Sequence, residues 1–218
     1  MHTRTWTRML TMFGVALTGL VWLGACERKQ SDDQEIITIG ATLPLTGDAA
    51  VWGKNTQKGI DLALAEINAA GGVLGHELRV VYEDTQALAR EGVNAYRKLV
   101  ATHNVPAIID DSVSSVTLAI APLAQKNKVV ILATGATAPK ISDAGEFIFR
   151  IWNSDAYEGE VAARFAYHDL GHRSAAVLYI NNDYGKGLEQ VFKVEFSKLG
   201  GKITASESFA QSATNMRT

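Results

Sequence analysis

From Ile36 onward the sequence alternates short apolar runs with longer segments in which apolar residues recur at helical spacing. The first run, residues 36–43 (IITIGATL), is apolar enough for a strand that is buried on both faces. The next segment, about 55–70, places four apolar side chains on one helical face: Ile60, Ala63, Leu64 and Ile67. Because strand and helix alternate, we expect an α/β protein built on parallel sheets with helices on both faces.

The same patterns predict the remaining elements in two groups. The first contains strands at 77–83, 106–109 and 129–133 and helices at 87–102 and from about Ser115, the last of which Pro122 should kink or shorten. The second contains helices at 157–170 and 185–199 and strands at 174–180 and 202–207. The break near 150–156 indicates two lobes, each a doubly wound parallel sheet. We assign residues 36–155 to lobe 1 and 156–218 to the first part of lobe 2.

The first 26 residues have the pattern of an export signal. Arg4 and Arg8 precede an uncharged, mostly apolar segment, 9–23, which as a helix would be about 22 Å long. This length is less than the thickness of the hydrocarbon core of a bilayer, which is about 30 Å. The ending LGAC resembles the bacterial lipobox, which predicts lipidation at Cys26, the only cysteine. The alternative is a chance cysteine in an ordinary signal peptide. Residues 27–35 (ERKQSDDQE) are polar throughout and predict a flexible tether.

Composition and motifs exclude several classes of function. A net charge of −2 argues against a nucleic-acid-binding surface, and a single cysteine allows no disulfide within the chain. The sequence has no G-x-S-x-G, no H-E-x-x-H and no P-loop, and its five histidines lack metal-ligand spacing. We therefore expect no enzyme, no metal site and no cofactor.

Two loops carry candidate ligand-binding groups. In α/β sheets, ligands bind beyond the carboxyl ends of the strands. Ser114 and Ser115 follow the predicted strand 106–109 and begin a helix, where free N–H groups favour an anion. Gly135 and Thr137 follow the predicted strand 129–133. The two loops could hold one carboxylate between them, although one of the serines could instead be a simple N-cap.

The chain resembles a known family over nearly its whole length from Ile36. The strings IGATLPLTGDAAVWGKNTQKGIDLALAEINAAGGVLG, SVSSVTLAIAPLAQKNKV, GATAPKISDAGEFIFR and NDYGKGL look like the type I periplasmic binding proteins of the branched-chain amino-acid (leucine/isoleucine/valine) and amide-binding group. The resemblance implies two lobes hinged around a ligand cleft, and delivery of the ligand to the permease of an ABC importer.

The resemblance also assigns site residues. Ser114, Gly135 and Thr137 match positions that hold the α-carboxylate and ammonium of the ligand, and we count the adjacent Ser115 and Ala136 as further ligand-binding candidates. Trp52 falls where an aromatic residue covers the ligand, Asp155 lies at the crossover between the lobes, and Tyr184 faces the cleft from the second lobe. Each has a structural alternative: Trp52 could pack the Gly53 turn, Tyr184 could belong to a helix-start turn, and Asp155 could cap the helix that follows it. Asp183 reads as a surface turn residue.

Two features depart from the family pattern. Asp110 and Asp111 stand near a position that is commonly glycine, so they should favour zwitterionic or cationic ligands if they point into the cleft. The sequence also ends at NMRT, where family members continue, so the second lobe is expected to be incomplete.

Taken together, these features predict a solute-binding lipoprotein, exported to the periplasm or the cell surface and anchored through Cys26. Its ligand should be a small amino acid, of the branched-chain type, or an amide. The alternative is a ligand-sensing module of the same fold that reports to a receptor.

Overall fold

A computed structural model of the chain describes residues 36–215. The predicted signal peptide, tether and lipidation at Cys26 lie outside the described residues. Within residues 36–215, the only ones searched, no helix combines the length and the apolar character needed to cross a membrane.

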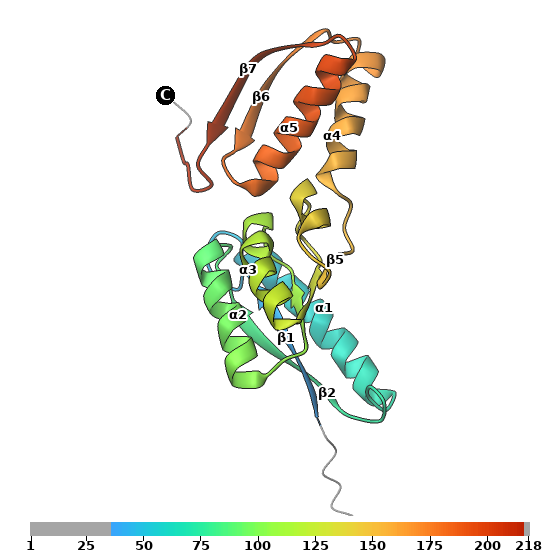
Figure 1. Cartoon of the computed structure of the whole chain (residues 1–218), viewed down its shortest axis with the longest axis vertical. Coiled ribbons are helices and arrows are strands. Elements are labelled where there is room, and N and C mark those ends of the chain that lie inside the picture. Colours follow the sequence, from blue (N-terminus) through green and yellow to red (C-terminus); the bar gives the residue numbers. More distant parts are fainter. Residues whose placement is uncertain (1–35, 216–218) are drawn as a thin grey trace, which may run out of the picture. The chain divides into compact units, whose positions relative to one another are not determined.

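The first sheet has five parallel strands in the order β2-β1-β3-β4-β5 (Figure 1). The strands are β1 (Ile37–Leu43), β2 (Leu78–Asp84), β3 (Ala107–Asp110), β4 (Val130–Ala133) and β5 (Ile148–Arg150). The helices that connect them are α1 (Ala50–Ala69), α2 (Ala89–His103) and α3 (Ser114–Asn127), followed by the short 3₁₀ helix η1 (Pro139–Asp143). This arrangement confirms the predicted α/β fold with a parallel sheet.

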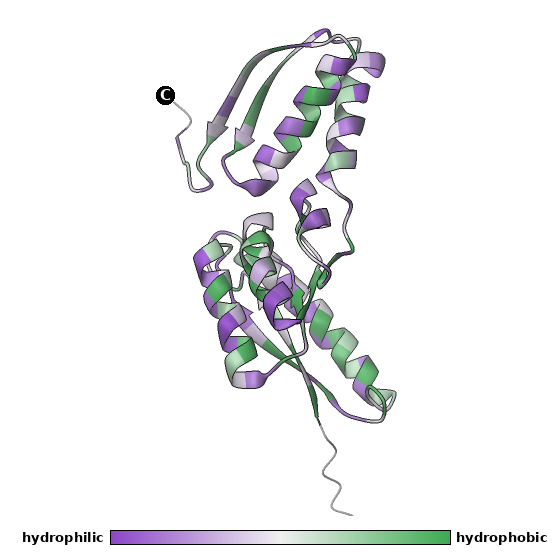
Figure 2. Ribbon diagram, viewed as in Figure 1, coloured by the Kyte–Doolittle hydropathy of each residue, from purple (hydrophilic) through white to green (hydrophobic). Residues whose placement is uncertain are grey.

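The two faces of this sheet are covered unequally. Because side chains alternate along a strand, Ile108 and Ile131 face α2 and α3, where they join a buried core with Leu99 and Ile120. On the opposite face α1 presents a largely apolar stripe (Figure 2), yet its only buried residue is Gly53. Ile39, Val80, Ile109 and Leu132, which line a cavity with α1, are all half-buried. The α2/α3 side therefore holds the core of this sheet.

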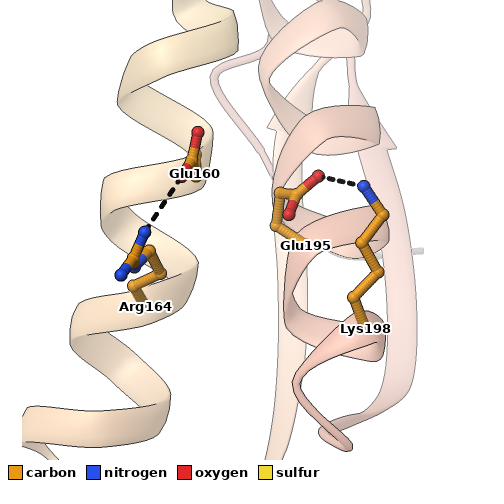
Figure 3. Close-up of polar contacts among 4 residues, drawn as sticks. All are labelled: Glu160, Arg164, Glu195 and Lys198. Carbon is orange, nitrogen blue, oxygen red and sulfur yellow. Dashed lines mark hydrogen bonds and ion pairs between the residues drawn. The ribbon is translucent and has the colours of Figure 1, made fainter.

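The second sheet consists of two parallel strands, β6 (Ser174–Ile180) and β7 (Lys202–Phe209). Two helices accompany it, α4 (Asp155–Arg164), which continues into the π-helical turn η2 (Phe165–Asp169), and α5 (Asp183–Lys198). Phe196 is fully buried and stacks on Phe192. Salt bridges within α4, Glu160–Arg164, and within α5, Glu195–Lys198, lie on more exposed faces (Figure 3).

Two predicted helix starts were wrong, the shortening expected at Pro122 is not observed, and one strand was not predicted. Helix α1 begins at Ala50, whereas the sequence predicted a start near 55. The true start was missed because the N-cap residue, Ala49, has no capping side chain that would mark it. Pro122 does not shorten α3, which continues to Asn127 with Ala121 and Ala124 in the core. A proline removes one helical hydrogen bond, and packing on the other side of α3 offsets that loss. Strand β5, with three residues, is too short for a periodic pattern. The helix predicted at 157–170 begins at Asp155 and changes to a π-helical turn at Phe165.

Candidate functional site

A cavity of about 930 Å³ runs along the α1 side of the first sheet to its carboxyl edge. Its apolar part lies between α1 and the strands. Its polar part is lined by residues that follow or face the strand ends: Trp52, Thr56, Asp111, Ser114, Thr134, Gly135 and Thr137. Trp152, Glu158, Asn182 and Tyr184, from later segments, also line it. The cavity therefore lies where parallel α/β sheets bind ligands.

Ser114 joins the loops after β3 and β4. It is the first residue of α3 and is 2% exposed. Its Oγ accepts hydrogen bonds from the backbone N–H groups of Thr137 (3.2 Å) and Ala138 (3.1 Å). The N-cap of α3 is Val113, so neither serine takes the alternative N-cap role. No described residue accepts the hydroxyl proton of Ser114, so this proton can be donated into the cavity that Ser114 lines.

Thr137 also lines the cavity and is held from behind by Asp155. The Thr137 hydroxyl donates to Asp155 Oδ2 at 3.0 Å, and the Asp155 N–H donates to the Thr137 carbonyl at 2.9 Å. Asp155 is fully buried, and its Oδ1 has no hydrogen-bond partner among the described residues. Burial raises the pKa of Asp155 to about 6, against the lowering effect of the Thr137 hydroxyl. Asp155 is not the cap of α4, because Ser154 takes that role.

The two neighbouring aspartates point in different directions. Asp110 is fully buried and accepts hydrogen bonds from Thr42 Oγ1 (2.9 Å) and Thr117 Oγ1 (2.5 Å), on the α3 side of the sheet. The expectation that it lies beside the cleft is therefore wrong. Asp111 lines the cavity, is 4% exposed, and accepts hydrogen bonds from the hydroxyls of Thr56 and Thr134.

Trp52 and Gly135 meet at the same end of the cavity. Trp52 lies in the first turn of α1 and is 42% exposed. A methyl group built on Gly135 would lie 2.5 Å from Trp52 Cζ2 and 2.7 Å from Asp111 Oδ1. Position 135 therefore has to be glycine for the indole and the carboxylate to come this close. The adjacent Ala136 is buried in the core and is not part of the cavity lining.

Ser115 and Asp183 contact each other away from the cavity lining. The Ser115 hydroxyl donates to Asp183 Oδ2 at 2.7 Å and accepts from the Asp183 N–H at 3.2 Å. Asp183 is thus the half-buried first residue of α5 and not a free surface turn residue. Tyr184 follows it and lines the cavity, and partial burial raises the pKa of its hydroxyl.

Sequence reasoning missed several lining residues: Thr56, Thr134, Trp152, Glu158 and Asn182. Thr134 directly follows β4, so its position beyond a strand end could have identified it. Thr56 gave no such signal, because its place depends on how α1 packs. Among residues 36–215, no cluster of three or more His, Cys, Asp or Glu side chains could hold a metal ion.

The parallel sheet, the cavity at its carboxyl edge and the second α/β unit define a protein of the periplasmic binding protein class. The family model described as periplasmic binding protein matches residues 36–218. The chain therefore belongs to this family, in its branched-chain amino-acid group.

Three relatives illustrate the similarity. The Leu/Ile/Val-binding protein homolog 1 of Brucella abortus (strain 2308) is 29% identical over 199 residues, which cover 90% of this chain and 52% of that protein. The crystal structure of the leucine-binding protein LivK from Thermotoga maritima MSB8 has a TM-score of 0.76 and 32% identity, and the match covers 82% of this chain and 50% of that one.

A third relative, the branched-chain amino-acid transporter substrate-binding protein LivJ from Streptococcus pneumoniae, was solved in complex with isoleucine. Its TM-score is 0.74 at 29% identity, over 84% of this chain and 52% of that one. The present chain thus spans about half the length of the relatives that it matches.

Proposed function

We propose that this chain is part of the extracytoplasmic solute-binding protein of an ABC importer and binds a small amino acid or an amide in the cavity. The observation that carries the proposal is Ser114, a buried hydroxyl that lines the cavity and has a proton with no acceptor among the described residues. The names of the similar proteins, which include leucine-binding and isoleucine-bound members, support this assignment.

The proposed binding role follows from the chemistry around Ser114. Its hydroxyl sits at the start of α3, where the first N–H groups of a helix have no partner within the helix and attract negative charge. The Ser114 hydroxyl can donate to a carboxylate or to an amide oxygen. The Thr137 hydroxyl donates its proton to Asp155, so its oxygen can only accept a hydrogen bond from a ligand, for example from an ammonium or an amide N–H. A ligand that contacted Tyr184 as well as Ser114 and Thr137 would favour the conformation in which all three side chains touch the ligand. A permease would recognise this ligand-bound conformation.

We propose binding rather than catalysis, because Ser114 lacks the partner that a nucleophile needs. A serine nucleophile requires a base that accepts its proton. Among the described residues, the hydrogen-bond partners of Ser114 Oγ are two backbone N–H donors, which cannot accept a proton. Export and a lipid anchor at Cys26 complete the proposed function and rest on the sequence pattern of residues 1–26.

The test is calorimetric titration of the full-length gene product, in mild detergent, with leucine, isoleucine, valine, other amino acids and simple amides. Ser114→Ala should weaken binding about 10- to 100-fold, since a hydrogen bond to a charged group contributes about 1.5 to 3 kcal/mol. The matched control is Ser197→Ala, an exposed serine on α5, which should bind as the wild type does. If no amino acid or amide binds, or if both variants lose affinity equally, the proposal is wrong.

A further inference from the structure

The charged side chains that line the cavity are all negative. They are Asp111 and Glu158, and no Lys, Arg or His belongs to the lining within residues 36–215. A ligand with net negative charge would meet two carboxylates and no basic side chain. The cavity therefore selects on charge as well as on shape.

Asp111 is the more strongly positioned of the two. The residue is 4% exposed, and its carboxylate accepts one hydroxyl on each oxygen, from Thr134 and from Thr56. Hydroxyls orient a carboxylate but do not neutralise its charge, and two carboxylate oxygens can accept about four hydrogen bonds. No salt bridge in the described part of the chain involves Asp111. Both its charge and part of its hydrogen-bonding capacity are thus left for a ligand.

An aromatic ring stands beside this carboxylate. Trp52 Cζ2 and Asp111 Oδ1 converge on Gly135 and would lie within 2.7 Å of a methyl group built there. Trp52 is half-exposed, so part of its ring is open to a ligand. An indole attracts a cation that lies over its face, and tryptophan is the strongest of the aromatic residues in this respect. A carboxylate and an indole side by side form a site that fits an organic cation.

We infer that the ligand is an organic cation, with an ammonium or guanidinium group bound between Asp111 and Trp52. This inference rests on the proposed function for the place of binding and adds the chemical class of the ligand. A neutral aliphatic side chain at this point would cover the Asp111 carboxylate and leave it buried without a countercharge, which is unfavourable. Because Glu158 adds a second carboxylate to the lining and no basic side chain among residues 36–215 lines it, the ligands preferred by this chain are amino acids or amines with net positive charge.

Matched ligand pairs test the inference by calorimetry on the full-length protein. Arginine and citrulline differ mainly in a guanidinium against a neutral urea group, and lysine and norleucine differ in a terminal ammonium. The wild type should bind the cationic member of at least one pair about tenfold or more tightly. Asp111→Asn should reduce that ratio to about one by weakening the cation, and should leave the neutral member within about twofold.

Circular dichroism and a second variant, Trp52→Leu, complete the test. The wild-type ratio needs no variant, so it holds even if Asp111→Asn folds poorly, and circular dichroism reports the folding of the variant. Trp52→Leu should lower the same ratio, because it removes the ring and keeps an apolar side chain.

The outcomes separate this inference from the proposed function. If leucine, citrulline or norleucine binds as well as the cations do, the charge preference is wrong and the binding function stands. An arginine-to-citrulline ratio that Asp111→Asn does not change also overturns the inference. If none of these ligands binds, the inference is wrong, and the titrations with the other amino acids and amides decide the proposed function separately.

Discussion

Asp110 should lower the stability of the folded protein as the pH rises, because it is a carboxylate with no exposed surface. Burial raises its pKa from 3.8 to about 6, the charge of Asp111 adds to this, and the hydroxyls of Thr117 and Thr42 only partly oppose it. The perturbation is Asp110→Asn, which keeps the shape and removes the charge. The amide can still accept one hydroxyl and donate to the other, so the main change is electrostatic.

The direction of the change in stability with pH follows from proton linkage. Near pH 3 both the folded and the unfolded chain hold the Asp110 proton, and the raised pKa costs nothing. Between pH 3.8 and about 6 the unfolded chain loses the proton first, so the stability of the wild type falls as the pH rises. The difference between 3.8 and about 6, at about 1.4 kcal/mol for each pKa unit, amounts to about 3 kcal/mol above pH 7.

The assay is urea unfolding of wild type and Asp110→Asn at pH 4.5 and pH 8. About 1 kcal/mol of the penalty is already present at pH 4.5, so the variant should gain about 2 kcal/mol relative to wild type between these two pH values. Asp111→Asn should move the window to lower pH, because it removes a charge that raises the Asp110 pKa. A difference between variant and wild type that is the same at both pH values would refute the reasoning.

Three further predictions concern folding and are checked by urea unfolding. Gly53→Ala should destabilise by about 2 kcal/mol or more, since its methyl group would lie 2.2 Å from the Pro44 carbonyl oxygen, whereas Gly59→Ala in the same helix meets nothing within 4 Å and should stabilise by about 0.5 to 1 kcal/mol. Equal effects of the two would contradict this. Asn182→Ala should cost about 1 kcal/mol, because Asn182 accepts the Gly185 N–H as the N-cap of α5, and Asn182→Ser should recover most of it. Phe196→Ala should cost about 3 to 5 kcal/mol, and Phe165→Ala, at a 52% exposed position, much less. Similar losses for the two phenylalanines would contradict the buried position of Phe196.

Much of the fold could be predicted because its elements follow local patterns. The strand at 174–180 was expected and is found at Ser174–Ile180, since this apolar run is bounded by the polar residues Arg173 and Asn181. The elements that were missed or shifted lacked such signals. Strand β5 has only three residues, and α1 begins at an uncapped alanine. Of the eight candidate ligand-binding residues, Trp52, Ser114, Gly135, Thr137 and Tyr184 line the cavity, while Ser115, Ala136 and Asp155 do not.

The sequence by itself determined the order of strands and helices and the loops at which polar residues gather. Only the tertiary structure decided which member of each adjacent pair faces the cavity. Asp110 points toward α3 and Asp111 into the cavity, because successive residues at a strand end project to opposite sides. Ser114 and Ser115 diverge because successive residues of a helix point about 100° apart. Which of these directions is buried depends on neighbours that are distant in the sequence, such as Thr56 on α1 for Asp111 and Thr42 on β1 for Asp110.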